Sequence, residues 1–227
     1  MSDNKQNHLF SNVDPTMMEV INNAVNMLNT QKLNAFVGLN KYAKESGVVF
    51  IGDSITEGFP IHELLKSDKP MYNRGIAGDQ TRDLQEKLQN VVLDLKPEKV
   101  FLLIGTNDPM DTDTPNEIVR RIEEICKSIL SSLSEVKLYV LSVYPINPNE
   151  EVNKTTLQVM GARTNEIIQT INAGIRDMTA NLKITFIDVY PLLLDANGEL
   201  NATYTYDGLH LNAEGYMVVK EVIQNYL

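Results

Sequence analysis

The chain has 227 residues, 43% of them hydrophobic, and carries 30 acidic residues against 20 Lys and Arg residues. The resulting net charge of −10 would repel nucleic-acid phosphates and anionic lipid headgroups, so we expect no nucleic-acid partner. The length fits one domain over residues 1–227, and no apolar stretch is long enough for an integral membrane protein.

The N-terminal segment, MSDNKQNHLFSNVDP, has no basic start followed by an apolar run. It therefore does not resemble a secretory signal, and we expect a cytoplasmic protein. Between Pro15 and Lys44 the apolar residues recur at a mostly helical spacing. This pattern predicts an N-terminal helical arm within residues 1–46, with a break near Asn29 and Thr30.

From Gly47 onward, short apolar runs alternate with longer amphipathic segments, as in a parallel sheet covered by helices on both faces. We expect a core over residues 47–227 with the α/β fold of a three-layer αβα sandwich, flavodoxin-like, with a five-stranded parallel sheet. The predicted strands are 48–51, 71–73, 100–104, 138–143 and 184–189. The predicted helices are Thr81–Leu95, Pro115–Leu133, Val152–Leu182 and Ala213–Tyr226.

Two further features have structural interpretations. The single cysteine, Cys126, falls in the apolar pattern of a helix and is expected to pack in the core. The acidic segment 110–117 lacks the spacing of a calcium-binding loop, so we interpret it as a solvated loop with Thr114 capping the next helix and Pro115 at its first position. We expect neither a metal nor a cofactor.

Small and polar residues follow the predicted strands, where an α/β sheet places its reactive groups. The segments are Gly52-Asp53-Ser54, Arg74-Gly75-Ile76-Ala77-Gly78-Asp79, Gly105-Thr106-Asn107-Asp108 and, after the last strand and a polar loop, Asp207-Gly208-Leu209-His210. Each has a plain structural explanation if taken alone. A serine after a strand can cap a helix, glycine and asparagine suit turns, and a lone histidine is often structural.

Together these residues supply every group that acyl transfer requires. Ser54 would be the nucleophile at a helix N-terminus, with Asp53 beside it in a supporting place. His210 would be the base, and Asp207, three positions earlier, would orient the imidazole ring. The backbone N–H groups of Ser54 and Gly78 and the side-chain amide of Asn107 would form the oxyanion hole.

The same segments also resemble a known family. FIGDSIT (50–56), NRGIAGDQT (73–81), IGTND (104–108) and DGLHLN (207–212) are similar, in order and spacing, to the four blocks of the SGNH (GDSL-type) hydrolases. Within that family the chain most resembles the catalytic subunits of platelet-activating-factor acetylhydrolase and their bacterial relatives. The α/β-hydrolase motif G-x-S-x-G is absent, because Ile55 and Thr56 follow the serine.

The pattern predicts a serine esterase that needs no cofactor, and the resemblance implies short acyl groups, acetyl among them, on a carbohydrate or a phospholipid-like molecule. A lysophospholipase or thioesterase is an alternative. A binding module without catalysis is a second alternative, and a flavodoxin-like nucleotide or flavin binder a third. The last would need a phosphate-cradling loop where this chain has GDSITEG. The oligomeric state is left open, with a homodimer included.

Overall fold

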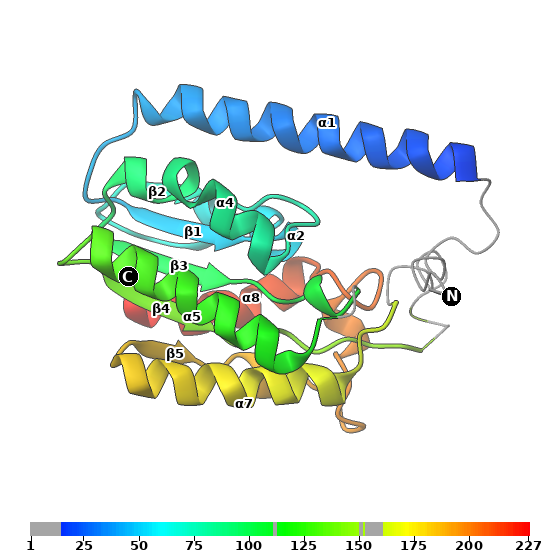
Figure 1. Cartoon of the computed structure of the whole chain (residues 1–227). Coiled ribbons are helices and arrows are strands. Elements are labelled where there is room, and N and C mark those ends of the chain that lie inside the picture. The colour runs from blue at the N-terminus through cyan, green and yellow to red at the C-terminus, as the bar shows by residue number, and fades with distance from the viewer. Residues whose placement is uncertain (1–14, 111–112, 150–151, 153–160) are drawn as a thin grey trace.

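The computed structural model describes residues 15–110, 113–149, 152 and 161–227 (Figure 1). Five parallel strands form one sheet in the order β2-β1-β3-β4-β5. The strands are β1 (Val48–Gly52), β2 (Met71–Asn73), β3 (Lys99–Leu103), β4 (Lys137–Leu141) and β5 (Thr185–Ile187). The predicted five-stranded parallel sheet is confirmed, and the ends of each strand lie within two residues of the expected positions.

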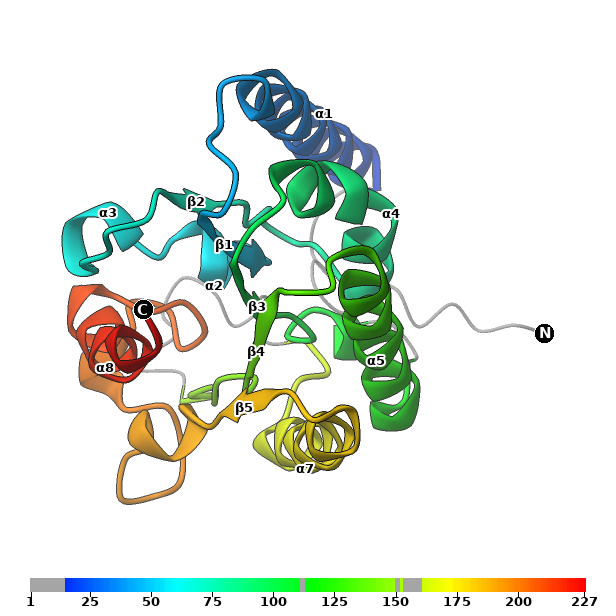
Figure 2. The same ribbon diagram turned by 90° about the vertical axis from the view of Figure 1, so that its left-hand side faces the viewer.

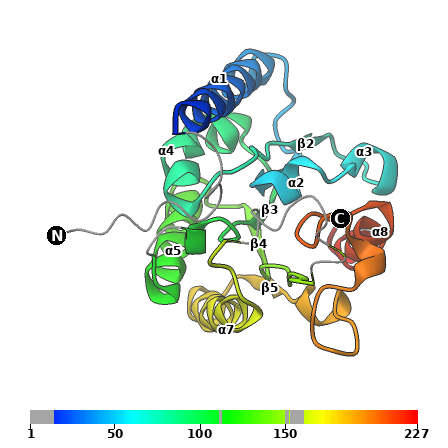
Figure 3. The ribbon, with the colours of Figure 1, turned by 90° about the vertical axis from the view of Figure 1, so that its right-hand side faces the viewer.

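Helices cover both faces of the sheet, as the end views show (Figures 2 and 3). One face carries α4 (Thr81–Val91), α5 (Pro115–Ser132) and α7 (Asn165–Leu182), and the other carries α3 (Ile61–Leu64) and α8 (Ala213–Ile223). The short helix α2 (Ser54–Glu57) follows β1 directly, and the long helix α1 (Pro15–Asn40) lies outside α4. Short 3₁₀ helices are η2 (Leu93–Leu95), η3 (Asp108–Met110), η4 (Tyr190–Leu192), η5 (Ala202–Tyr204) and η6 (Gln224–Tyr226). Across the described ranges no helix is both long and apolar enough to cross a membrane.

The alternation of side chains along the strands divides the core into two layers. Val49, Val100 and Val140 point toward the α4–α5–α7 layer. On the opposite face Phe50, Phe101 and Tyr139 stack across three strands, with ring centroids 4.8 and 4.7 Å apart. Both faces of the sheet are buried, which explains the nearly continuous apolar runs in the sequence. Cys126 on α5 is fully buried in the first layer, as predicted.

Several predicted helix boundaries were wrong. No break interrupts α1, because Asn29 bonds outward to the Ala77 carbonyl and Thr30 bonds to the Asn26 carbonyl one turn earlier. The helix predicted over Val152–Leu182 starts only at Asn165; most of its missing part, residues 153–160, lies outside the described residues. The Thr164 hydroxyl caps it by accepting the Ile167 N–H. The helices predicted to reach Leu95 and Tyr226 end earlier and continue as η2 and η6.

Helix α1 has two different halves. Phe36 in the second half is buried against the core. In the first half, every described side chain before Asn29 is exposed, Val20 and Leu28 each by 58%. Figure 1 shows this half extending toward the ends at which the strand arrows point.

The order of the strands places a topological switch point between β1 and β3 at this edge of the sheet. From β1 the chain moves to β2 on one side and then returns to place β3 on the other side of β1. The loops after β1 and β3 therefore lead away from each other, which is where open α/β sheets bind ligands. Ser54 follows β1, and Asn107 follows β3.

Candidate active site

Three side chains predicted to act together form a continuous hydrogen-bonded chain. Ser54 Oγ lies 2.8 Å from His210 Nε2. His210 Nδ1 lies 2.6 Å from Asp207 Oδ2. The serine begins α2, whereas the other two residues belong to the loop between η5 and α8. The fold thus brings the first and last predicted motifs into direct contact across 156 positions of sequence.

The loop that carries His210 is held largely by its own residues. Asp207 Oδ1 accepts the backbone N–H groups of Leu209 (2.9 Å) and His210 (2.7 Å), which leaves Oδ2 for the imidazole ring. Thr205 Oγ1 accepts the N–H groups of Asp207 and Gly208 and donates to the His210 carbonyl. Burial alone would raise the pKa of Asp207, but the hydrogen bonds from His210 and Leu209 outweigh it and lower that pKa below its usual value. Asp207 is therefore an anion at neutral pH.

The position of Ser54 is fixed by a turn that only glycine permits. Gly52 has a φ of +154°, and a Cβ there would lie 1.9 Å from the Leu103 carbonyl oxygen. The chain then turns directly into α2, where the Asp53 carboxylate caps the helix by accepting the Ile55 N–H at 2.9 Å. Asp53 is fully buried, and burial raises its pKa to about 6 although the Ile55 N–H and the Arg163 charge act against the rise. Asp53 thus caps the helix that begins with Ser54.

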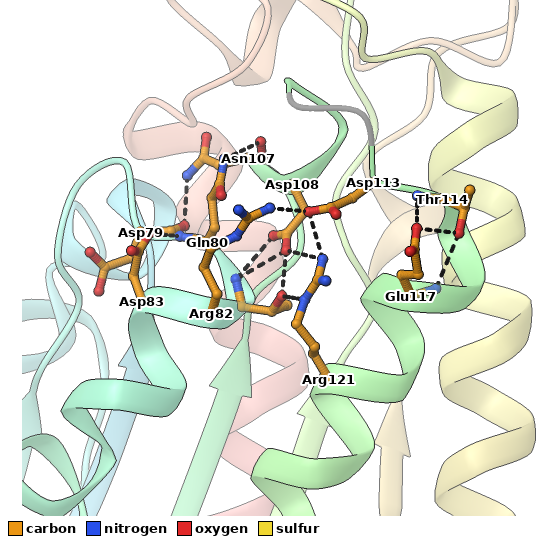
Figure 4. A network of polar contacts seen from close by, with 11 residues as sticks. Asp79, Gln80, Arg82, Asp83, Asn107, Asp108, Asp113, Thr114, Glu117 and Arg121 are labelled. Atoms are coloured by element: carbon orange, nitrogen blue, oxygen red, sulfur yellow. Dashed lines mark hydrogen bonds and ion pairs between the residues drawn. The ribbon is translucent and has the colours of Figure 1, made fainter.

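Three N–H donors are available for an oxyanion. The backbone N–H groups of Ser54 and Gly78 have no acceptor among the described residues. Gly78 has a φ of +80°, and no described atom lies within 4 Å of the place where a Cβ would stand, so its surroundings are open. Asn107 donates one Nδ2 hydrogen to the Asp79 carbonyl at 2.9 Å (Figure 4), and its second hydrogen has no acceptor in the described part of the chain.

The loop that carries Gly78 is held by hydrogen bonds to side chains of α1 and α2. The Ala77 N–H donates to Glu57 at 2.7 Å, and Asn29 of α1 donates to the Ala77 carbonyl at 3.0 Å. Lys32 of α1 forms an ion pair with the same Glu57. Nothing in the local sequence pattern of α1 or α2 indicates that these three side chains contact a loop so distant in sequence.

A buried polar network supports the loop after β3, which carries Asn107 (Figure 4). Asp108 accepts from the backbone N–H and hydroxyl of Thr81 and pairs with Arg121. Arg163 contacts the loop directly, donating from Nε to the Thr106 carbonyl and from Nη2 to Asn107 Oδ1, both at 2.6 Å. Sequence reasoning missed Arg163, since it lay inside a predicted helix and carried no motif.

The surroundings of the site add two observations. Tyr206 is 65% exposed, and its ring lies nearly parallel to that of His210, with centroids 6.0 Å apart. A cavity of about 250 Å³ lies behind Glu57 between α1 and α3, and none of the predicted site residues lines it. In the described ranges no three His, Cys, Asp or Glu side chains are grouped in a way that could hold a metal ion.

Comparison with known proteins identifies the relatives of this arrangement. Residues 50–218 match the model of the GDSL-like lipase/acylhydrolase family. Platelet-activating factor acetylhydrolase IB subunit alpha1 of Bos taurus is 28% identical over 192 residues, which cover 81% of this chain and 76% of the relative. N-acylneuraminate cytidylyltransferase of Escherichia coli O18:K1:H7 is 30% identical over 186 residues, 81% of this chain but only 41% of that longer protein.

A solved structure extends the likeness to nearly the whole chain. A protein of Streptococcus pneumonia, provisionally described as a platelet activating factor, is similar with a TM-score of 0.86 and 31% identity. The likeness covers 94% of this chain and 99% of that one. The fold, the order of the motifs and the family model therefore all point to the same family of proteins.

Proposed function

Because the chain belongs to the GDSL-like lipase/acylhydrolase family, a family of hydrolases, we propose that it cleaves short-chain carboxylic esters, acetyl esters above all, through an acyl-enzyme on Ser54. The observation that carries this proposal is the unbroken contact from Ser54 through His210 to Asp207. A nucleophile bonded to a base that is itself oriented by a carboxylate is the arrangement that activates a hydroxyl group.

The proposed reaction has two halves. His210 Nε2 takes the hydroxyl proton as Ser54 Oγ attacks the ester carbonyl, and it then gives that proton to the departing alcohol. Water, deprotonated by the same nitrogen, attacks the acyl-enzyme and releases the acid and the free serine. In each half the carbonyl oxygen becomes negative, and the N–H groups of Ser54 and Gly78 with the Asn107 amide would stabilise it.

The acetyl preference is supported by the similarity to an acetylhydrolase subunit. For the alcohol part of the ester we propose an acetylated carbohydrate. Tyr206 presents an exposed ring beside His210, and a flat aromatic face is suited to pack against the apolar face of a sugar ring. Platelet-activating-factor-like phospholipids, lysophospholipids and thioesters are the competing substrates.

The test begins with the nucleophile. Ser54→Ala should abolish both esterase activity and covalent labelling by a fluorophosphonate, while the melting temperature stays close to that of the wild type. Equal labelling of both proteins would contradict the proposal. A series of p-nitrophenyl esters of increasing chain length then tests the acyl preference, which should favour acetate.

The alcohol part of the ester is tested separately, by comparing acetylated sugars with the three competing substrates. Tyr206→Ala should raise KM for an acetylated sugar and leave ethyl acetate nearly unaffected, since the two-carbon alcohol part of that ester offers no ring to stack on Tyr206. Tyr206→Phe is the matched control and should behave as the wild type with both. An equal effect of Tyr206→Ala on the two substrates would argue against the sugar-binding role.

A further inference from the structure

A buried arginine lies directly behind the proposed oxyanion hole. We propose that Arg163 is a positioning residue that holds the Asn107 side-chain amide in the one orientation able to stabilise the oxyanion. This inference rests on the proposed function and adds to it a residue that no sequence motif indicates.

The two contacts of the amide specify the same orientation independently. A guanidinium group can only donate hydrogen bonds, so the atom of Asn107 that faces Arg163 Nη2 at 2.6 Å must be the oxygen Oδ1. A backbone carbonyl can only accept, so the atom that faces the Asp79 oxygen at 2.9 Å must be Nδ2. One Nδ2 hydrogen is used in that bond, and the planar amide leaves the other for a substrate oxygen.

Arg163 also fixes the backbone from which Asn107 projects. Its Nε donates to the Thr106 carbonyl at 2.6 Å, so one rigid guanidinium group holds both the main chain before Asn107 and the end of its side chain. Only 7% of Arg163 is exposed, which limits competition from water for either bond.

The charge of Arg163 adds a second effect. Burial lowers the pKa of Arg163 to about 10, and the nearby Asp53 and Asp108 carboxylates act against that decrease, so the group is cationic at neutral pH. A cationic donor on Oδ1 withdraws electrons from the amide and makes Nδ2–H a stronger donor, because hydrogen bonds in series polarise one another. Arg163 would thereby influence the transition state without touching the substrate.

The principal experiment is a double-mutant cycle on kcat with p-nitrophenyl acetate. Arg163→Met should lower kcat by about 10-fold to 100-fold with KM little changed, since the loss concerns a bond made mainly in the transition state. In an Asn107→Ala background the same change should cost less than about threefold, because Arg163 acts through the missing amide. A kcat within threefold of the wild type, or equal losses in both backgrounds, would overturn the inference.

A matched control separates positioning from general support of the fold. Arg121 belongs to the same polar network and pairs with Asp108 and Asp113, but among the described residues it makes no hydrogen bond or ion pair with Asn107. Arg121→Met should lower the melting temperature without the selective loss of kcat. If it lowers kcat as much as Arg163→Met and with the same coupling to Asn107→Ala, the special role of Arg163 is refuted.

A conservative variant keeps the inference testable if Arg163→Met does not fold. Arg163→Lys retains the buried charge, but an ammonium group lacks the planar fork that reaches both acceptors. Its kcat should therefore lie between those of the wild type and Arg163→Met. If only the lysine variant folds, its kcat should be at least threefold below that of the wild type. A folded lysine variant with wild-type kcat would overturn the inference. The serine mechanism is tested in the same experiment by fluorophosphonate labelling. If the wild type is labelled and Ser54→Ala is not, the mechanism stands, and the kcat values of the Arg163 variants then test the role of Arg163 alone.

Discussion

The base side and the oxyanion side of the proposed site are built from different kinds of contact. On the base side, most of the bonds that hold Asp207 and His210 lie within the segment Thr205–His210, and the Asn147 N–H joins them from outside by donating to the Gly208 carbonyl at 2.8 Å. On the oxyanion side, Asn107 is held by Asp79 and Arg163, which are 28 and 56 positions away in sequence. The geometry of the first side depends mainly on one loop, whereas that of the second depends on the packing of several elements.

The difference predicts how each side responds to substitution. A change on the base side should act mainly on chemistry, because the loop geometry is largely self-contained. A change on the oxyanion side should combine with changes at distant positions, because its residues share partners. The following predictions test this contrast, from the largest expected effect to the smallest.

The largest effect is expected for Asp207→Asn. The asparagine Oδ1 can still accept the Leu209 and His210 N–H groups, so the loop and the melting temperature should be nearly unchanged. Its Nδ2 would replace the carboxylate oxygen that faces His210 Nδ1, favour the wrong tautomer and remove the charge that stabilises the imidazolium. We expect kcat to fall by up to about four orders of magnitude. A stable variant within fivefold of wild-type kcat would remove Asp207 from the proposed mechanism.

Asn107→Ala should have the next largest effect. Loss of one oxyanion donor typically lowers kcat by about two to three orders of magnitude while KM changes little. Unlike Asp207→Asn, this variant should also be less stable, because Arg163 Nη2 loses its Asn107 acceptor. Steady-state kinetics and thermal unfolding of the two variants therefore test the contrast directly. A kcat loss below threefold would mean that the amide is not a donor.

A smaller effect is expected at Thr205, the residue that organises the base loop. Thr205→Val removes the acceptor of two buried N–H groups and should lower the free energy of unfolding by about 1–3 kcal/mol. Activity should fall by about tenfold as Asp207 loses its fixed position. Thr205→Ser retains the hydroxyl group and should keep most of both properties. If the two variants are equally active, the hydroxyl bonds do not maintain the loop.

The smallest effect concerns stability alone and arises from buried carboxyls. Burial raises the pKa of Asp79 to about 6 from 3.8, in spite of the bond from Lys87, and Asp53 is raised to about 6 as well. Between pH 4 and pH 6 the folded protein therefore binds more protons at these groups than the unfolded chain does. Their contribution makes the free energy of unfolding decrease as pH rises through this window.

Asp79→Asn tests that contribution. It should flatten the decrease by an amount on the order of 2 kcal/mol, since one pKa unit corresponds to about 1.4 kcal/mol. Denaturant unfolding of wild type and variant at pH 4 and pH 6 measures the difference. Parallel pH profiles for the two proteins would contradict the assignment to Asp79.

The sequence predicted what depends on periodicity and on short motifs. Buried strands such as Val48–Gly52 appear as apolar runs because helices cover both faces of the sheet. Ser54, Asn107 and His210 were found because each stands in a compact segment after a strand or beside a second reactive residue. The close spacing of Asp207 and His210 suffices for their contact, and a single loop provides it.

What the sequence did not reveal depends on contacts between distant segments. Arg163 belongs to no sequence motif. Its contact with Asn107 is evident only in the structure, where the loop before α7 lies against the loop after β3. The sequence pattern shows Asn29 only as a polar residue that interrupts an apolar helix, which is why it predicts a break in α1; the contact with the Ala77 carbonyl is seen only in the structure. The Asn29 amide donates to a backbone carbonyl of a distant loop and does not compete for the backbone hydrogen bonds of its own helix.

The burial of Cys126 has a practical consequence for experiments on this protein. Cys126 is the one cysteine of the chain, it is completely buried in α5, and burial raises the pKa of its thiol to about 12. Thiol-reactive dyes and cross-linkers require an accessible thiolate, so the native protein should remain unlabelled under conditions that modify surface cysteines. A single cysteine introduced on the exposed half of α1, for example at Asn23, would then be a unique attachment point for a fluorophore or spin label.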